Sequence, residues 1–365
     1  MEQSVKEILA DDFWIMPATP EYIDEGVPYI TSKNIKNGII DFTKVNYISQ
    51  DAYESISKNR PILVGDILIS MIGTLGETAE VKETDGSFYG QNMFLVRLDE
   101  SKVNKRYFLN FFKSNSVKRA LEGKQNQSTQ KYLKANHIEN LTIPMPSLDE
   151  QKLVAEQLDK LSQIIALRSE ELKHLDELIK ARFVELFKEC NNYELLGDAD
   201  ILISDGNYSS KYPTADEFVE EGVPFIRASN MVDNTITDDE MYHISAEKHA
   251  ELVKGHVKPY DVLIATRGAG IGKIAVVPER HNDSNVNAQI VLLRCNKEKY
   301  NPLYLSWYLK LQDTQIKIQG LISGSAQPQL PIKRLVQLEL LRPDIEKQND
   351  FADFVHQVDK SKVVA

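Results

Sequence analysis

The chain carries the same pattern twice. Residues 26–81 (GVPYITSKNIKNGIIDF, then GDILISMIGTLGETAEV) recur as residues 222–277 (GVPFIRASNMVDNTITD, then YDVLIATRGAGIGKIAVV). The match extends beyond this stretch, since Pro17 matches Pro213 and Gln151 matches Gln348. A repeat of this length is a whole domain with its connector, because the units of solenoid proteins are several-fold shorter. The sequence therefore predicts two domains of one fold, an internal two-fold relation and two similar functional sites.

Composition is that of a globular protein. The 365 residues are 42% hydrophobic and 27% charged, which suits two domains of about 150 residues. No apolar run approaches the roughly 18 residues that a membrane span needs, and the first residues lack the pattern of a signal peptide, so we expect a cytoplasmic protein without membrane contact. Cys190 and Cys295 occupy non-equivalent places, and the seven histidines show no ligand spacing. We therefore expect neither a disulfide framework nor a metal site.

The distribution of charge bears on nucleic-acid binding. A net charge of −11 argues against a protein that holds DNA by itself, because neutralised phosphates supply most non-specific affinity. Basic residues nevertheless gather at 118–134 and at the corresponding point of the second repeat, 310–334. Charge runs are usually solvated surface. Because both runs fall at the same point of the repeat, we predict phosphate contacts by Lys124, Lys131, Lys134, Lys317 and Lys333.

Each repeat has the pattern of a small mixed α/β domain. Short apolar runs rich in branched residues, separated by Gly and Asn, predict strands at 27–30, 66–70, 78–81 and 93–98. An apolar face predicts a helix over about 104–121, and a last strand is expected near 141–143. The second repeat copies this order between 223 and 343.

A long helix separates the repeats. Residues 148–187 contain neither Gly nor Pro, and apolar residues recur every seven positions. Roughly 40 helical residues span about 60 Å. Residues 344–365 begin in the same way and are about half as long. If a two-fold relates the repeats, the two helices run antiparallel. The expected helix-helix seam is Leu158, Leu161, Ile165, Leu172, Leu175 and Ile179 with Phe351, Val355 and Val358.

These elements together resemble the specificity subunit of type I restriction-modification systems. They are G-[IV]-P-[YF]-I at 26–30 and 222–226, a D-[IV]-L strand at 65–68 and 261–264, a glycine turn at 73–76 and 267–272, and P-[SD]-x-x-[EK]-Q at 146–151 and 343–348. The resemblance covers nearly the whole chain. It implies target-recognition domains at 1–146 and 191–343, and spacer helices at 147–190 and 344–365.

The resemblance also implies a function without catalysis by this chain. Each target-recognition domain would read one half of a bipartite, asymmetric site in double-stranded DNA, and the helices would set the unread gap. Two methyltransferase subunits, carrying S-adenosylmethionine, would methylate adenine, and motor-nuclease subunits would join for restriction. We expect no cofactor on this chain itself.

Two motifs imitate catalytic ones. Asn301-Pro302-Leu303-Tyr304 resembles the loop that holds the target amino group in adenine methyltransferases, but it lies where a helix begins, so capping explains it better. The run 267–273 resembles a phosphate-binding loop, yet Arg267 replaces its first Gly and Ile274 its metal-binding hydroxyl. We therefore predict that the chain is not an enzyme.

A duplicated fold that reads two sequences needs one scaffold with different loop tips. Three loop pairs qualify: 31–34 with 227–230, 70–74 with 265–269, and 125–131 with 323–329. Gln and Asn can read adenine and Arg can read guanine, which predicts adenine preference in the first half and guanine in the second. Asn34, Asn230, Gly73 and Gly268, identical in both copies, are assigned to the turns. The candidate base readers are Thr31, Lys33, Gln125, Asn126, Gln127, Gln130, Arg227, Arg267, Ser323, Ser325 and Gln327.

Two other function classes remain open from the sequence. A structural protein that dimerises through its long helix would show no sequence-dependent DNA protection. A regulatory decoy would bind methyltransferase without productive DNA recognition, and the short second helix is compatible with that role.

Overall fold

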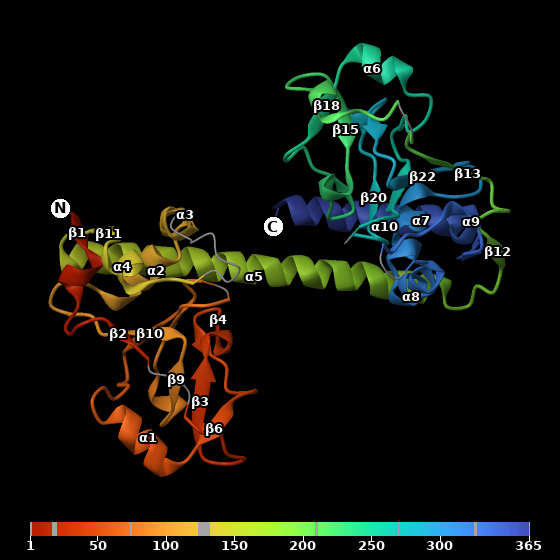
Figure 1. Cartoon of the computed structure of the whole chain (residues 1–365). Coiled ribbons are helices and arrows are strands. Elements are labelled where there is room, and N and C mark those ends of the chain that lie inside the picture. Colours follow the sequence, from red (N-terminus) through yellow and green to blue (C-terminus); the bar gives the residue numbers. More distant parts are fainter. Residues whose placement is uncertain are drawn as a thin grey trace. The chain divides into compact units, whose positions relative to one another are not determined.

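The computed structural model describes residues 2–16, 20–73, 75–122, 132–208, 211–268, 270–324 and 327–364. The chain forms two compact units, Met1–Ala166 (unit 1) and Leu167–Ala365 (unit 2), with the boundary inside the long helix. Figure 1 shows the elements of each unit, which we describe separately. Among the described residues, no helix is both long enough and apolar enough to cross a lipid bilayer.

Unit 1 is built on a four-stranded antiparallel sheet in the order β2-β10-β7-β8, and a three-stranded sheet in the order β6-β3-β9, in which β3 and β9 are parallel. Two short antiparallel pairs, β4-β5 and β1-β11, complete it. The strands are β1 Glu2–Ser4, β2 Trp14–Ile15, β3 Val27–Thr31, β4 Ile35–Lys36, β5 Ile39–Ile40, β6 Asn46–Ile48, β7 Ile67–Ser70, β8 Thr78–Glu80, β9 Tyr89–Gln91, β10 Met93–Val96 and β11 Thr142–Pro144.

The helices of unit 1 correct one prediction. The expected single helix over 104–121 is two helices, α2 (Lys105–Phe112) and α3 (Asn115–Glu122). The break follows from Ser114, whose hydroxyl accepts a hydrogen bond from the amide of Val117 at 3.3 Å and so starts a new helix. Phe108 and Phe112 of α2 are buried in the core beside the four-stranded sheet. The other helices are α1 Gln50–Ser57, α4 Ala135–Glu139 and the 3-10 turns η1 Val5–Ile8, η2 Ser32–Asn34 and η3 Glu83–Asp85.

Unit 2 repeats this architecture, which confirms the duplication as a structural one. A four-stranded antiparallel sheet has the order β13-β22-β19-β20, and a second sheet has the order β14-β18-β15-β21, again with one parallel pair, β15-β21. The elements are β12 Tyr193–Leu195, β13 Ile201–Asp205, η4 Ala215–Glu217, β14 Phe218–Val219, β15 Val223–Ile226, η5 Ala228–Asn230, β16 Met231–Val232, β17 Thr235–Ile236, β18 Tyr242–Ile244, α6 Ala246–Glu251, β19 Val262–Ala265, β20 Ile274–Val276, η6 Glu279–His281, β21 Asn285–Val286, β22 Ile290–Cys295, α7 Pro302–Lys310, α8 Gln312–Leu321, α9 Ile332–Leu335 and β23 Glu339–Leu341.

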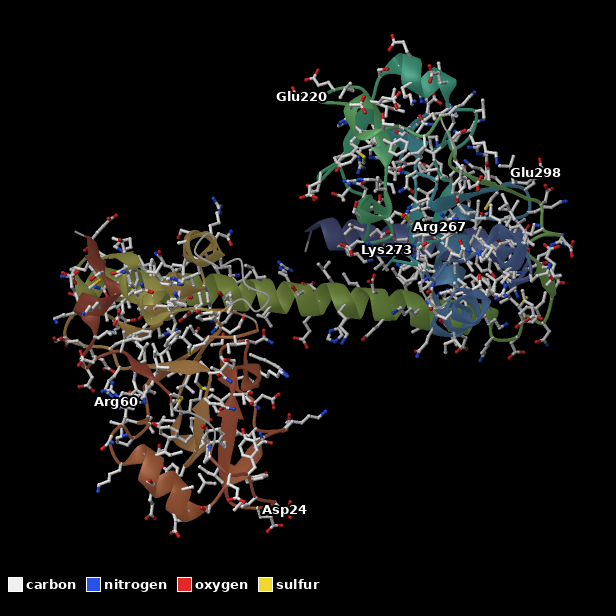
Figure 2. The ribbon with its side chains drawn as sticks, in the orientation of Figure 1. Asp24, Arg60, Glu220, Arg267, Lys273 and Glu298 are labelled. Carbon is white, nitrogen blue, oxygen red and sulfur yellow. The ribbon has the colours of Figure 1, made fainter. Side chains whose placement is uncertain are left out.

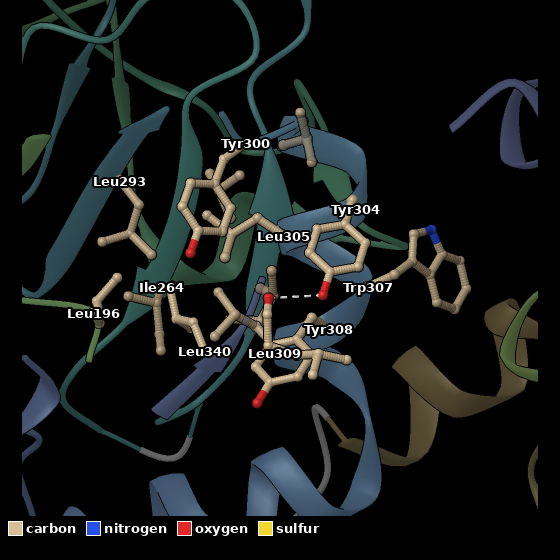
Figure 3. Packing of buried hydrophobic residues seen from close by; sticks show 14 of the residues in the cluster. Leu196, Ile264, Leu293, Tyr300, Tyr304, Leu305, Trp307, Tyr308, Leu309 and Leu340 are labelled. Atoms are coloured by element: carbon tan, nitrogen blue, oxygen red, sulfur yellow. Dashed lines mark hydrogen bonds between the residues drawn. The ribbon is translucent and has the colours of Figure 1, made fainter. Parts of the chain in front are cut away.

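The core of unit 2 lies between its sheet and α7. Nearly every residue of α7 is buried, and Figure 3 shows α7 residues such as Tyr304 and Leu305 in one cluster with the strand residue Ile264. The hydroxyl of Tyr304 donates to the carbonyl of Leu341 at 2.9 Å, the bond drawn dashed in Figure 3. Burial raises the pKa of Tyr304, so its phenol stays a neutral donor.

The two long helices occur where the sequence predicts them, as α5 (Leu148–Phe187) and α10 (Ile345–Val364). Within unit 2 they run antiparallel: the ring of Phe351 lies 5.1 Å from that of Phe183, whereas Lys362 forms an ion pair with Asp176 at 2.7 Å. Residues later in α10 therefore contact residues earlier in α5. The antiparallel pairing is confirmed.

The predicted seam is only partly covered. Leu175 and Ile179 pack in one core cluster with Phe351, Val355 and Val358. Leu158, Leu161, Ile165 and Leu172 are 39%, 54%, 66% and 40% exposed. These four residues are not buried in a seam in the structure, and within unit 2 the described contacts of α10 fall on α5 from Leu175 onward.

Candidate nucleic-acid interface

The residues shared by both copies serve the turns, as predicted. The side-chain oxygen of Asn34 accepts from the amide of Thr31 at 2.9 Å, and that of Asn230 accepts from the amide of Arg227 at 3.0 Å. Each Asn also donates to a carbonyl beyond the following hairpin. Gly73 and Gly268 have φ of +84° and +77°, where other residues are strained. These residues fix the scaffold and leave the neighbouring tips free to differ.

In unit 2, backbone pairing brings two of the predicted loops together. Arg267, on the turn after β19, bridges to Gln329, and the amide of Leu330 donates to the carbonyl of Thr266 at 2.9 Å. Gln329 in turn exchanges two backbone hydrogen bonds with Ser323, both at 2.9 Å. Ser323, Gln329 and Leu330 are thus held beside Arg267, which Figure 2 labels.

Side chains able to read or hold DNA surround this junction. One hollow is lined by Arg267, Gly268, Gln289, Gln327, Pro328 and Gln329. A second hollow shares Arg267 and Gln329 with the first and adds Tyr208 and Lys333. Arg267, Gln327 and Lys333 are exposed. The structure therefore unites three of the predicted residues, Arg267, Gln327 and Lys333, around one concave surface, which we call the unit 2 tip.

The unit 2 tip includes three residues that sequence reasoning missed: Tyr208, Gln289 and Gln329. Tyr208 lies with its ring 5.4 Å from the Arg267 guanidinium, and burial raises its pKa, so the phenol remains neutral. The carbonyl of Gln289 accepts from both the amide and the hydroxyl of Thr266, which fixes Gln289 beside Arg267. Gln329 belongs to one of the three predicted loop pairs. Tyr208 and Gln289 belong to none of them, and the pairing of β13 with β22 and β19 brings them to the unit 2 tip.

Other predicted residues lie elsewhere in unit 2. The Arg227 guanidinium sits 3.5 Å from the centre of the Tyr242 ring and donates to the carbonyl of Glu240 at 2.7 Å. Lys317 forms an ion pair with Glu339 at 3.0 Å, and the hydrogen bond to that carboxylate raises the pKa of Lys317. Both cations already have partners within the chain, so binding DNA would require them to exchange those partners.

Unit 1 carries different tips on the same scaffold. Ile72 bridges to Tyr132 where unit 2 has Arg267 and Gln329, and these residues are 38% and 36% exposed. Lys33 and Lys134 are exposed, whereas the Thr31 hydroxyl donates to the side chain of Asn34 at 3.2 Å. The remaining predictions fall outside the described residues: Lys124, Gln125, Asn126, Gln127, Gln130, Lys131 and, in unit 2, Ser325.

The motif at Asn301 is a helix cap. Its side-chain oxygen accepts from the amide of Leu303 at 2.9 Å, and Pro302 occupies the first helical position of α7. In the run 267–273, which resembles a phosphate-binding loop in sequence, the Lys273 amine donates to the carbonyl of Ala228 at 3.4 Å. Lys273 therefore bridges two turns of the domain. Both residues have structural roles.

The family follows from comparison with known proteins. The model of the type I restriction modification DNA specificity domain matches residues 16–177 and again residues 200–363. The chain belongs to this family and contains two copies of its domain.

Two curated relatives of the chain are type I specificity subunits. A putative type I restriction enzyme MjaX specificity subunit of Methanocaldococcus jannaschii is 24% identical over 359 residues, covering 92% of this chain and 80% of that protein. The type I restriction enzyme EcoBI specificity subunit of Escherichia coli is 24% identical over 366 residues, covering 92% of this chain and 73% of that one. The chain is therefore a type I specificity subunit by family, a class that recognises DNA.

Solved structures support the fold. A type I restriction-modification system S subunit from M. genitalium aligns with a TM-score of 0.52 and 15% identity, over 99% of this chain and 90% of that one. A chain from a structure of type I system assembly and conformational transition aligns with a TM-score of 0.53 and 18% identity, over 100% of this chain and 91% of that one.

Proposed function

We propose that the chain reads a bipartite, asymmetric site in double-stranded DNA, one half with each domain, and directs partner subunits to it. What supports this most is the contrast between equivalent tips. One scaffold carries Arg267 and Gln329 in unit 2 and Ile72 and Tyr132 in unit 1. Arg can bind the guanine edge through two hydrogen bonds, whereas apolar side chains contact the thymine methyl group. The two halves of the site therefore differ in sequence.

The chain itself supplies recognition and no chemistry. S-adenosylmethionine and the transfer of a methyl group to adenine belong to two methyltransferase subunits, and DNA cleavage to motor-nuclease subunits, as in the family that the chain joins. The complex works in the cytoplasm. The net charge of −11 fits a subunit whose partners contribute most of the phosphate contacts.

Selection of DNA from a random pool tests the proposal. The chain is purified together with its methyltransferase, the complex is incubated with a randomised duplex pool, and the bound DNA is sequenced. We expect two short conserved blocks separated by a fixed, unread gap. A stable complex that enriches no sequence would favour the regulatory decoy. One conserved block would contradict reading by two domains.

A further inference from the structure

Unit 2 contains a cluster of two histidines and an aspartate on the side of the domain that carries α6. His249 belongs to α6, His256 lies in the loop that follows it, and Asp283 precedes β21. One side-chain ligand atom from each lies within 4.8 Å of the others. We propose that these three side chains bind one divalent transition-metal ion, with Zn²⁺ as the best match.

The separations of the ligand atoms fit a small tetrahedral ion. Nε2 of His249 lies 3.3 Å from one oxygen of Asp283, and Nδ1 of His256 lies 3.4 Å from the other. Zinc-ligand bonds of about 2.0–2.2 Å in a tetrahedron place neighbouring ligand atoms about 3.4 Å apart. Each imidazole therefore already lies at the required distance from one carboxylate oxygen, and a small shift within the 4.8 Å cluster would bring both nitrogens around one ion. Two imidazoles and one carboxylate also form a donor set that zinc accepts, with water as a fourth ligand.

The outer nitrogens of both rings have acceptors. Nε2 of His256 contacts the backbone carbonyl of Leu252, and Nδ1 of His249 contacts the side-chain oxygen of Asn285. These acceptors orient the two rings so that Nε2 of His249 and Nδ1 of His256 both face Asp283. An acceptor behind each ligating histidine is the usual outer layer of a metal site.

The backbone holds Asp283 in position. Its φ is +61°, a left-handed conformation that few residues other than Gly adopt and that Asp tolerates better than most. Its amide donates to the carbonyl of Val257 at 2.9 Å, and the amide of Val257 donates to Ser284 at 2.9 Å. These two bonds fasten the Asp283 segment to the loop that carries His256, so the ligands come from segments that the fold has already joined.

Unit 1 serves as an internal control for the role of this cluster. Tyr53 corresponds to His249, since each donates its amide to the capping Ser at 2.9 Å, and Pro61 corresponds to His256, since each carbonyl accepts from an equivalent Arg. Ser87 corresponds to Asp283 through the register of the parallel strand pair. The same domain thus folds without any of the three ligands, so the fold does not account for their presence in unit 2.

The sequence predicted no metal site because the ligands follow no motif. The two histidines are separated by a turn after a short helix, and the aspartate comes from a distant segment. Side chains of His249, His256 and Asp283 are 16%, 34% and 68% exposed, so an ion from solution can reach them. A bound ion would cross-link α6, the loop after it and the segment before β21.

Zinc titration of the full chain tests the proposal. The protein is freed of metal by chelation and dialysis, and Zn²⁺ binding is measured by calorimetry and by the unfolding temperature. We expect one Zn²⁺ per chain and a rise in unfolding temperature with Zn²⁺. His256→Gln should weaken binding by at least about tenfold. X-ray absorption should show nitrogen and oxygen neighbours at about 2.0–2.2 Å.

Two variants separate loss of the site from loss of the fold. Asp283→Asn keeps a residue that tolerates the left-handed backbone and removes the charge, so it should fold normally and bind Zn²⁺ more weakly. His174→Gln, which removes an exposed histidine on α5, should bind as the wild type does. Failure of the wild type to bind Zn²⁺, or equal binding by all variants, would overturn the proposal and leave the cluster as a proton-bridged ion pair.

Discussion

The side-chain oxygen of Gln348 accepts a hydrogen bond from the backbone amide of Asn301 at 2.9 Å, which ties the start of α10 to the start of α7. Gln348 is fully buried and also donates to the carbonyls of Lys299 and Pro343. Gln151 makes the same three bonds at the start of α5, including one from Asn104 at 2.8 Å. The Gln of the repeated P-[SD]-x-x-[EK]-Q motif therefore fastens each long helix to its own domain.

Replacing Gln348 should weaken this junction. Gln348→Ala leaves one amide and two carbonyls buried without their partner, which should lower the free energy of unfolding of unit 2 by about 2–4 kcal/mol. Gln357→Ala, at an exposed position on the same helix, should change it by less than about 0.5 kcal/mol. Urea unfolding of the three proteins measures the difference. Equal stability of the two variants would show that the buried hydrogen bonds contribute little.

The buried ion pair at the start of β19 gives a second prediction. Asp261 is 1% exposed and accepts two hydrogen bonds from Arg294, at 2.8 and 2.7 Å, and these bonds raise the pKa of Arg294. Asp261→Asn leaves a partly buried guanidinium without its counter-charge and should cost about 3–5 kcal/mol. Glu171→Gln, which breaks an exposed pair with Arg168, should cost under about 1 kcal/mol. Thermal unfolding checks both, and a small loss for Asp261→Asn would contradict the prediction.

The unit 2 tip predicts two distinct effects on DNA. Arg267→Ala should relax preference at one base pair by about 1–3 kcal/mol, because a bidentate contact to guanine is lost. Lys333→Ala should weaken binding to all sequences alike and reduce the salt dependence by about one phosphate contact. Affinities of the methyltransferase complex for duplexes that differ at single positions distinguish them. If Arg267→Ala leaves discrimination unchanged, Arg267 contacts phosphate.

Buried His281 predicts a dependence on pH. It is 2% exposed, and burial lowers its pKa, against the opposing effect of Asp238, whose oxygen lies 3.0 Å away. The folded state therefore binds the proton more weakly than the unfolded chain does. The contribution of neutral His281 to the free energy of unfolding is therefore complete above a pH of about 6.5, and it is lost as the pH falls and the unfolded chain takes up the proton. His281→Gln should flatten the fall in unfolding free energy between about pH 7 and 5.

Two controls accompany that measurement. A chelator is present throughout, so that metal release from His249 and His256 contributes nothing to the slope. His174→Gln removes an exposed histidine and should keep the wild-type pH dependence. An unchanged slope in His281→Gln would assign the acid sensitivity to other groups.

The elements that follow from local pattern were predictable. The repeat predicted the two domains, and a stretch without Gly or Pro and with a heptad pattern predicted α5, which runs from Leu148 to Phe187 within the expected 147–190. The break at Ser114 was missed because a serine inside an apolar helical pattern does not show whether it will cap a new helix. The exposure of the apolar residues from Leu158 to Leu172 was not predicted. A heptad pattern shows that one face of a helix is apolar, but it does not show which element packs against that face.

The site was predictable only in part. Arg267 stood out because it differs from its counterpart at a matching loop position, Gln327 because it lies in one of the paired loops, and Lys333 because it lies in a basic run that falls at the same point of both repeats. Tyr208 and Gln289 join them through the pairing of strands far apart in the sequence, which no local pattern records. The histidine cluster escaped for the same reason.

The map of methylated adenine in host DNA tests the central claim most directly. The chain is expressed with its methyltransferase in cells that lack other adenine methylation, and the methylated positions are read by long-read sequencing. Reading by two domains predicts one bipartite motif with unequal halves and a fixed gap. Methylation at a continuous motif, or at a motif with two identical halves, would contradict it.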